Sequence, residues 1–122
     1  MAPRILITGS RNYSDPATLR AALFQAWRAL GQRYDTVLVS GAHRHGADAL
    51  AEQYWRELCL PVETHPADWS THGRAAGPIR NQQMVDRGAD ICLAFPTSSS
   101  IGTWDCVRRA KAAGIPVEIH KQ

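Results

Sequence analysis

Long apolar runs are missing from this chain of 122 residues. No stretch approaches the roughly 20 residues that a membrane-spanning helix needs, and residues 1–4 lead into a predicted strand without the pattern of a signal peptide. The three cysteines, Cys59, Cys92 and Cys106, are an odd number at unrelated spacings, which disfavours a disulfide framework. We therefore expect reduced cysteines, no membrane span and a cytoplasmic protein.

Several catalytic and binding signatures are also absent. The chain has no G-x-S-x-G elbow and no G-x-x-x-x-G-K-[ST] loop, which argues against a hydrolase triad and against a P-loop NTPase. Its five histidines form no zinc-like spacing with cysteines or carboxylates, so neither a metal nor another cofactor is expected. No run rich in lysine and arginine stands out, which makes nucleic acid a poorly supported partner.

The composition is that of an ordinary globular protein. Hydrophobic residues make up 44% of the chain and charged residues 20%, which is enough apolar material for one core. The length is near that of one domain, and there is no internal repeat or low-complexity segment, so we expect residues 1–122 to form a single domain. The formal net charge of +3 fits an anionic ligand, although solubility alone explains it equally well.

Five apolar runs alternate with helical patterns along the chain. The predicted strands are residues 4–8, 36–40, 61–65, 90–95 and 115–119. The predicted helices cover about 19–30, 47–58, 79–87 and 103–113. Asp15 before Pro16 suits the start of the first helix, and Gly88 and Gly114 suit the ends of the third and fourth. Residues 66–78 form the one long connection, a candidate mobile flap.

The strands are continuously apolar rather than alternating, which indicates a parallel sheet covered on both faces. We therefore predict a single Rossmann-like α/β domain of three layers, with a parallel sheet of about five strands. In such sheets ligands bind at the carboxyl ends of the strands, near the point where the strand order reverses.

Three loops of small residues follow three of these strands, at residues 8–11, 40–46 and 96–103. Such loops, and the helix starts behind them, present backbone N–H groups and positive potential to an anion. They predict one phosphate-bearing ligand, although ordinary turns and helix caps use the same residue types. Asp48 also has a plainer explanation, as a complement to a helix dipole. The candidate ligand-binding residues are Gly9, Ser10, Arg11, Ser40, Gly41, Arg44, Gly46, Asp48, Asn81, Ser98, Ser99, Ser100, Gly102 and Thr103.

Four larger side chains are further candidates. Arg80 is predicted in the first turn of the third helix, where a cation is unfavourable unless an anion lies nearby. An ion pair with a neighbouring carboxylate is the alternative. Tyr13, Trp69 and Trp104 follow the first, third and fourth strands and are candidates for stacking on a base, with simple packing as the alternative.

Five short motifs together resemble the SLOG superfamily, and within it the small bacterial and phage proteins of the YspA type. The motifs are Ile5-Leu-Ile-Thr-Gly-Ser-Arg, Ser40-Gly-Ala-x-x-x-Gly-Ala-Asp, Ala67-Asp-Trp, Gly77-Pro-Ile-Arg-Asn-x-x-Met and Ile101-Gly-Thr-Trp-Asp. The resemblance covers nearly the whole chain. It implies a Rossmann-like domain that binds nucleotides or nucleotide-derived ligands, as a sensor or binding domain.

The same superfamily includes the LOG phosphoribohydrolases, which split a nucleoside monophosphate into base and ribose 5-phosphate. Their signature is an arginine–lysine pair on a helix, followed by Pro-Gly-Gly-x-Gly-Thr-x-x-Glu. Arg80 matches the arginine, and Pro96 and the Gly102-Thr103 pair match parts of the loop, but the glutamate position is Cys106. Asp105 lies one residue earlier, a rotation of ~100° on a helix.

Three hypotheses follow from the residues and the resemblance together. The first is a domain that binds or senses a nucleotide-derived small molecule. The second is a LOG-like hydrolase of the N-glycosidic bond, with Arg80 and Asp105 as its catalytic residues. The third is a protein that binds single-stranded nucleic acid. A homodimer or higher homo-oligomer is a further expectation, with Trp27 and Trp55 as candidates for its surface or, equally, for the core.

Overall fold

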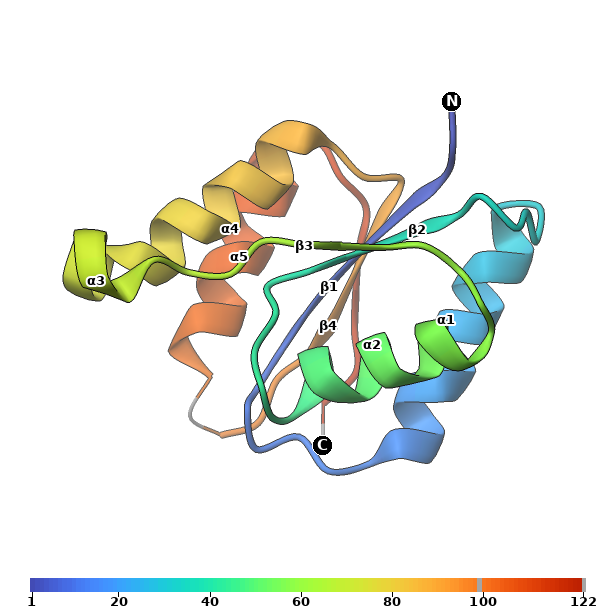
Figure 1. Ribbon diagram of the computed structural model, residues 1–122, viewed down its shortest axis with the longest axis horizontal. Coiled ribbons are helices and arrows are strands. Elements are labelled where there is room, and N and C mark those ends of the chain that lie inside the picture. Colours follow the sequence, from blue (N-terminus) through green and yellow to red (C-terminus); the bar gives the residue numbers. More distant parts are fainter. Residues whose placement is uncertain (99, 122) are drawn as a thin grey trace.

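The computed structural model describes residues 1–98 and 100–121. Its five strands form one parallel sheet in the order β3-β2-β1-β4-β5 (Figure 1). The strands are β1 (Arg4–Gly9), β2 (Val37–Ser40), β3 (Val62–Thr64), β4 (Ile91–Phe95) and β5 (Val117–Ile119). In the register of the sheet, Ile5 pairs with Leu38 on one side and with Ile91 on the other. The predicted α/β class and the parallel sheet of five strands are confirmed.

Helices cover both faces of this sheet (Figure 1). They are α1 (Pro16–Ala29), α2 (Ala47–Glu57), α3 (Trp69–His72), α4 (Ala76–Arg87) and α5 (Ile101–Ala112), with a 3₁₀ turn over Gly73–Ala75. Helices α1 and α2 pack on one face, and α4 and α5 pack on the other. Among the described residues, no helix is long and apolar enough to cross a membrane.

The alternation of side chains along β1 explains why its sequence is continuously apolar. Ile5 and Ile7 pack with Leu23 of α1 and Trp55 of α2 in one core. Leu6, between them, points to the other face. Its core partners there are Val39, Met84, Val85, Cys92, Cys106 and Ala110. Both faces of the strand are therefore withdrawn from water.

The residues considered for self-association belong to the first of these cores. Trp27 is 5% exposed and Trp55 is fully buried, with their ring centroids 6.0 Å apart. The indole of Trp55 also donates a hydrogen bond of 3.2 Å to the Thr36 carbonyl. Of the two alternatives left open for these tryptophans, the structure confirms the core, because each completes the packing between α1, α2 and the sheet. Of the cysteines, which are all free, Cys92 and Cys106 are buried and Cys59 is exposed.

The helix ends that the sequence predicted are confirmed. The Asp15 carboxylate accepts hydrogen bonds from the Thr18 backbone N–H at 3.2 Å and from its hydroxyl at 2.6 Å, with Pro16 at the first helical position. Gly88 ends α4 with a φ of 85°, and Gly114 follows α5 with a φ of 79°, a conformation that favours glycine.

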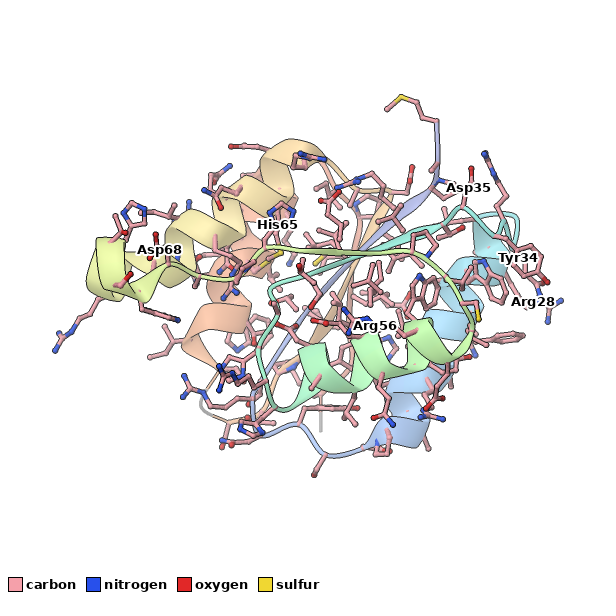
Figure 2. The ribbon with its side chains drawn as sticks, viewed as in Figure 1. Arg28, Tyr34, Asp35, Arg56, His65 and Asp68 are labelled. Carbon is pink, nitrogen blue, oxygen red and sulfur yellow. The ribbon has the colours of Figure 1, made fainter. Side chains whose placement is uncertain are left out.

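The connection over residues 66–78 differs from the prediction, since helical structure fills much of it. Asp68, labelled on α3 in Figure 2, caps that helix by accepting a hydrogen bond of 3.2 Å from the Thr71 N–H. The 3₁₀ turn then runs directly into α4, which begins at Ala76 rather than at residue 79. Arg80 is consequently the fifth residue of α4 and lies in its second turn, so the argument from an unfavourable first-turn cation was wrong.

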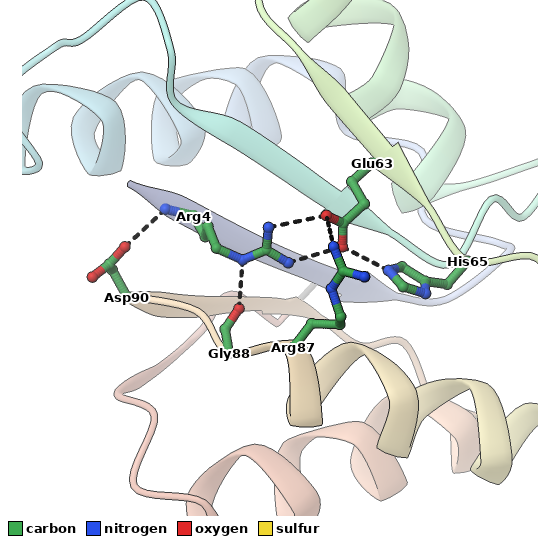
Figure 3. A network of polar contacts seen from close by, with 6 residues as sticks. All are labelled: Arg4, Glu63, His65, Arg87, Gly88 and Asp90. Atoms are coloured by element: carbon green, nitrogen blue, oxygen red, sulfur yellow. Dashed lines mark hydrogen bonds and ion pairs between the residues drawn. The ribbon is translucent and has the colours of Figure 1, made fainter. Parts of the chain in front are cut away.

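A polar network ties the edge strand β3 to the centre of the sheet (Figure 3). The Arg4 guanidinium donates two hydrogen bonds, of 3.0 and 2.8 Å, to the Glu63 carboxylate. His65 and Arg87 contact the same carboxylate at 2.7 and 3.3 Å. The hydrogen bonds from Arg4 are the main cause of a Glu63 pKa near 2 instead of its ordinary 4.5. Glu63 is therefore ionised at neutral pH.

Candidate functional site

The strand order reverses between β1 and β4, and a cavity of about 630 Å³ lies at the carboxyl ends of the strands there. Parallel sheets commonly bind ligands at such a reversal, because the two flanking loops diverge to opposite faces. Twelve of the residues singled out from the sequence line this cavity. They are Gly9, Ser10, Arg11, Gly41, Asp48, Trp69, Arg80, Asn81, Ser100, Gly102, Thr103 and Asp105.

Other candidates from the sequence lie outside the lining. Ser99 is not among the described residues. Ser40 is buried beneath the loop that it begins, and its hydroxyl donates a hydrogen bond of 2.7 Å to Glu52. The Tyr13 ring is 3% exposed and packs edge-on against Phe95, with ring centroids 5.2 Å apart. The remaining candidates outside the described lining are Arg44, Gly46, Ser98 and Trp104.

Gly46 has a packing role in the structure. Its φ is 73°, and a Cβ there would overlap the Ser10 carbonyl oxygen and the Arg11 backbone. The next residue, Ala47, donates its backbone N–H to the Ser10 carbonyl at 3.1 Å. The start of α2 is therefore held directly against the loop that follows β1.

The start of α5 faces the cavity. Ile101, Gly102 and Thr103 in its first turn all line the cavity wall. Ser100 precedes the helix but its hydroxyl makes no capping bond, because it accepts the Thr97 N–H at 2.7 Å instead. The positive end of the α5 dipole is thus directed at the cavity, where it favours an anion.

The loops after β1 and β4 are joined through their hydroxyl groups. The Thr97 hydroxyl donates a hydrogen bond of 2.8 Å to the Ser10 hydroxyl, which also accepts the Asn12 N–H at 3.0 Å. Ser10 is 6% exposed and Ser100 is 7% exposed. These hydroxyls fix the shape of the cavity floor.

Arg80 projects from α4 to the end of β2. Its Nη1 donates a hydrogen bond of 2.6 Å to the Gly41 carbonyl, and its Nε donates one of 2.9 Å to the Asn81 side-chain oxygen. Both acceptors are neutral. Among the described residues, no carboxylate forms an ion pair with this half-buried guanidinium, so the alternative suggested by the sequence does not hold.

Asp48 and Arg80 both lie close to Gly41. Burial raises the pKa of the Asp48 carboxyl to about 6, while a hydrogen bond from the His43 N–H at 3.2 Å and the charge of Arg80 act in the opposite direction. A Cβ on Gly41 would lie 2.8 Å from the Arg80 Cζ and 3.1 Å from the Asp48 Oδ2. Glycine at position 41 is what lets these two charged groups approach each other.

Asp105 also lines the cavity, as a carboxylate with several partners. Its Oδ2 accepts hydrogen bonds from the Asn81 Nδ2 at 3.0 Å and from the Arg109 Nε at 2.9 Å. Burial acts to raise the pKa of Asp105, but the hydrogen bonds from Arg109 and Asn81, with the charges of Arg109 and Arg108, lower it overall. The group is ionised at neutral pH.

The structure also shows which residue of α5 takes the cavity-facing position. Cys106 is fully buried and points into the core, where its thiol contacts Cys92 and Thr8. Asp105, one residue earlier, lines the cavity instead. The carboxylate at this wall therefore comes from Asp105.

Sequence reasoning missed several residues of the lining. Arg74 comes from the 3₁₀ turn, where no strand or helix pattern marked it. Arg108 lies three residues after Asp105 on α5, and this helical spacing was a usable signal. His43 lies within the predicted loop over residues 40–46 but was not singled out, and burial followed by the charge of Arg11 lowers its pKa. The other missed residues are Ile7, Thr8, Asn12, Gly77, Pro78, Met84 and Ile101.

Positive charge dominates the cavity. The side chains of Arg11 and Arg74 make no hydrogen bond or ion pair with any other described residue, and they join Arg80 and Arg108 in the lining. Against these four arginines stand only Asp48 and Asp105. Within residues 1–98 and 100–121, no group of three or more histidines, cysteines or carboxylates is placed to hold a metal ion.

Comparison with known proteins identifies relatives of this chain. The sequence profile of the YspA, cpYpsA-related SLOG family (YAcAr) matches residues 3–72, which run from β1 through α3. The "Gene 61 protein" of Mycobacterium phage D29 is 44% identical over 124 residues, covering 93% of each chain. No solved structure matches this chain.

Proposed function

This chain belongs to the YspA, cpYpsA-related SLOG family, and we propose from that premise that its cavity binds a nucleotide or a nucleotide-derived ligand. The phosphate lies between Arg80 and the start of α5 in this proposal. The remainder of the ligand extends toward Trp69 at the cavity mouth.

One observation carries the proposal. The Arg80 guanidinium is half-buried at the cavity wall and is held by two neutral acceptors, the Gly41 carbonyl and the Asn81 amide. Asp48 lies near this guanidinium, but no described carboxylate forms an ion pair with it, and a phosphate that enters the cavity supplies a direct anionic partner. The planar guanidinium also matches the geometry of phosphate oxygens.

The surroundings of Arg80 support the same ligand class. The first turn of α5 directs its dipole at the cavity, and Arg11, Arg74 and Arg108 add positive charge around it. Trp69 is 57% exposed and lines the cavity, so its ring is available for stacking on a base.

The test is a thermal-shift and calorimetric screen of the full chain against AMP, ADP-ribose, NAD, cyclic nucleotides and GTP. A ligand at a hundredfold excess over its dissociation constant stabilises the fold by ~2.7 kcal/mol. Arg80→Gln is expected to weaken binding of each hit roughly ten- to a hundredfold, because a hydrogen-bonded charge is lost.

Arg87→Gln is the matched control. Arg87 lies on the same helix α4, but it pairs with Glu63 away from the cavity (Figure 3). We expect this variant to bind as the wild type does. The proposal fails if no nucleotide shifts the melting temperature, or if the Arg87 variant loses as much affinity as the Arg80 variant.

A second candidate function is hydrolysis of the N-glycosidic bond of a nucleotide. The observation that favours it is the ionised Asp105 carboxylate on the wall of the same cavity. Such a carboxylate stabilises the positive charge that develops on the ribose as the bond breaks. Release of free base from a bound nucleoside monophosphate distinguishes this function from simple binding.

A further inference from the structure

Asp48 is a buried carboxylate with an unused oxygen in the cavity wall. Asp48 is only 6% exposed, and its Oδ2 accepts a hydrogen bond of 3.2 Å from the His43 backbone N–H. Among the described residues no donor reaches the Oδ1. No described buried side-chain oxygen is both sealed from solvent and unpartnered, so solvent reaches the Asp48 Oδ1, and Asp48 is part of the cavity lining. A ligand with a hydroxyl group at this place would complete the hydrogen bonding of the carboxylate.

The other charged groups around Asp48 are not placed to accept a hydrogen bond from a ligand hydroxyl. Glu52 lies one turn further along α2. Its carboxylate already accepts hydrogen bonds from the Ser40 hydroxyl at 2.7 Å and from the Arg56 guanidinium at 2.9 Å. His43 contributes its backbone N–H, and its imidazole has a pKa below the ordinary value because of burial and the charge of Arg11. The buried Cys106 thiol and Arg80 are the remaining titratable neighbours. Asp48 is therefore the acceptor that this side of the cavity offers.

The position of Asp48 relative to Arg80 restricts what the hydroxyl can belong to. Both groups come within about 3 Å of the point where a Gly41 side chain would begin, at 3.1 Å for the Asp48 Oδ2 and 2.8 Å for the Arg80 Cζ. A ligand that places an anion on Arg80 must carry its hydroxyl donors close to that anion. A ribose 5-phosphate unit does so, because one small ring joins its phosphate to a pair of adjacent hydroxyls.

We propose that Asp48 binds the 2′- and 3′-hydroxyls of the ligand's ribose and makes the cavity selective for ribonucleotides over 2′-deoxyribonucleotides. This inference rests on the proposed function, since it takes the phosphate to be at Arg80. Two adjacent hydroxyls donate to one carboxylate, and a deoxyribose leaves part of that buried acceptor unsatisfied. The affinity for a 2′-deoxyribonucleotide should therefore fall by more than the loss of one solvent-exposed hydrogen bond would cause.

The test compares matched pairs of ligands on the full wild-type chain. Calorimetry at pH 7.5 measures the dissociation constants of AMP, GMP, CMP and UMP and of their 2′-deoxy counterparts, with 3′-deoxy-AMP as a further probe. We expect each ribonucleotide that binds to do so roughly ten- to a hundredfold more tightly than its 2′-deoxy partner. The wild-type comparison needs no variant, so it holds whether or not substitutions at position 48 fold.

Asp48→Asn then assigns the selectivity to this side chain. Removing a negative charge near Arg80 strengthens phosphate attraction for both members of a pair, so the ratio of their dissociation constants is the informative quantity. We expect this ratio to fall to near one. Glu52→Gln is the matched control, since it removes a carboxylate from the same helix without changing the cavity lining, and it should keep the wild-type ratio.

The outcomes separate this inference from the function on which it rests. If no nucleotide of either series binds, the proposed function fails and the inference fails with it. If nucleotides bind but the two sugars are equivalent, the inference alone is overturned. A preference for guanine that ignores the sugar and disappears in Asp48→Asn overturns it as well, because Asp48 would then contact the base.

Discussion

Arg4 donates two hydrogen bonds, of 3.0 and 2.8 Å, to the two carboxylate oxygens of Glu63, across the intervening strand β2. This paired geometry joins the first strand to the edge strand β3, which has only three residues. Both side chains are about one-fifth exposed, so water screens the pair less than it screens an ordinary surface ion pair.

Glu63→Gln is expected to lower the free energy of unfolding by about 1–3 kcal/mol at pH 7, because a charged acceptor is lost. The folded pKa of Glu63 is about 2, below its ordinary 4.5. Its contribution is therefore complete above about pH 4.5 and is lost as the pH falls toward 2. Urea denaturation of both proteins across this range should show the difference shrinking in acid.

The control for Glu63 is Glu57→Gln. Glu57 is exposed and lies 3.4 Å from an exposed Arg20, so its loss should change the stability by less than about 0.5 kcal/mol. A stability difference between wild type and Glu63→Gln that stays constant from pH 7 to pH 2 would contradict the first prediction.

Asp48→Asn is expected to stabilise the free protein while it removes the sugar selectivity. Burial raises the pKa of Asp48 to about 6 from its ordinary 3.8, so the folded state binds its proton more tightly than the unfolded state. The ionised group consequently destabilises the fold as the pH rises from about 4 to 6, and the cost is complete above that range. At pH 8 the variant should gain about 1–3 kcal/mol. Equal melting temperatures at pH 8, or a less stable variant, would show that burial of the ionised Asp48 carboxylate does not destabilise the fold.

Gly102→Ala tests the start of α5 without a packing clash. A Cβ on Gly102 meets no atom within 4 Å beyond its chain neighbours and the nearby backbone of its own helix, and its φ is not positive. We expect a melting temperature equal to or slightly above that of the wild type, because alanine favours a helix by roughly 0.5–1 kcal/mol. The added methyl group narrows the wall where the phosphate is proposed to bind, and about tenfold weaker nucleotide binding should follow.

Gly114→Ala is a comparison for that variant, since Gly114 lies beyond the other end of α5 and has a φ of 79°. It should lose stability and keep its affinity for the nucleotide. Gly102→Ala with unchanged affinity would indicate that the ligand does not approach the first turn of α5.

Trp69→Phe is expected to remove most of the tryptophan fluorescence change on nucleotide binding. Trp69 is 57% exposed at the cavity, whereas Trp27 and Trp55 are buried in the core. Stacking of a base on the indole quenches its emission, and loss of a good stack weakens binding by up to about tenfold. Trp104→Phe, outside the described lining of the cavity, should retain the signal. The same quenching in both variants would exclude Trp69 as the stacking residue.

Asp105→Asn separates binding from hydrolysis. Under the proposed binding function, AMP incubated with the wild-type chain is recovered intact by chromatography. The variant should then change the dissociation constant by less than about tenfold, because Asp105 is already satisfied by Asn81 and Arg109. Free adenine released by the wild type and not by the variant would favour the second candidate function.

Much of the fold was predictable from local patterns. Ile5, Leu6 and Ile7 are apolar without interruption, which required helices on both faces, and Asp15 and Gly88 marked helix ends by their own chemistry. The sequence has no capping residue that indicates the start of α4. Its cap is Ala75, which has no side chain to accept a hydrogen bond, and the helix continues directly from the preceding 3₁₀ turn.

The candidate site was less predictable, because sequence places a residue in a loop without giving the direction of its side chain. Tyr13 turns into the core because its N–H closes a turn onto the Ser10 carbonyl at 3.2 Å, which brings its ring against Phe95. Arg80 donates to the Gly41 carbonyl rather than to a carboxylate, which depends on how α4 lies beside the loop that follows β2. No spacing along the chain encodes that arrangement.

The hydrogen bond between the Thr97 and Ser10 hydroxyls joins residues that are 87 positions apart, and it has a consequence for synthesis of the protein. Closing a loop of this length is entropically costly, so we expect this contact to form late. On the ribosome, β1 and α1 emerge long before α5, and the cavity lacks the wall that α5 supplies until this helix is free. Nascent chains arrested before α5 emerges should therefore fail to retain nucleotide, and ligand cannot assist folding until that last helix docks.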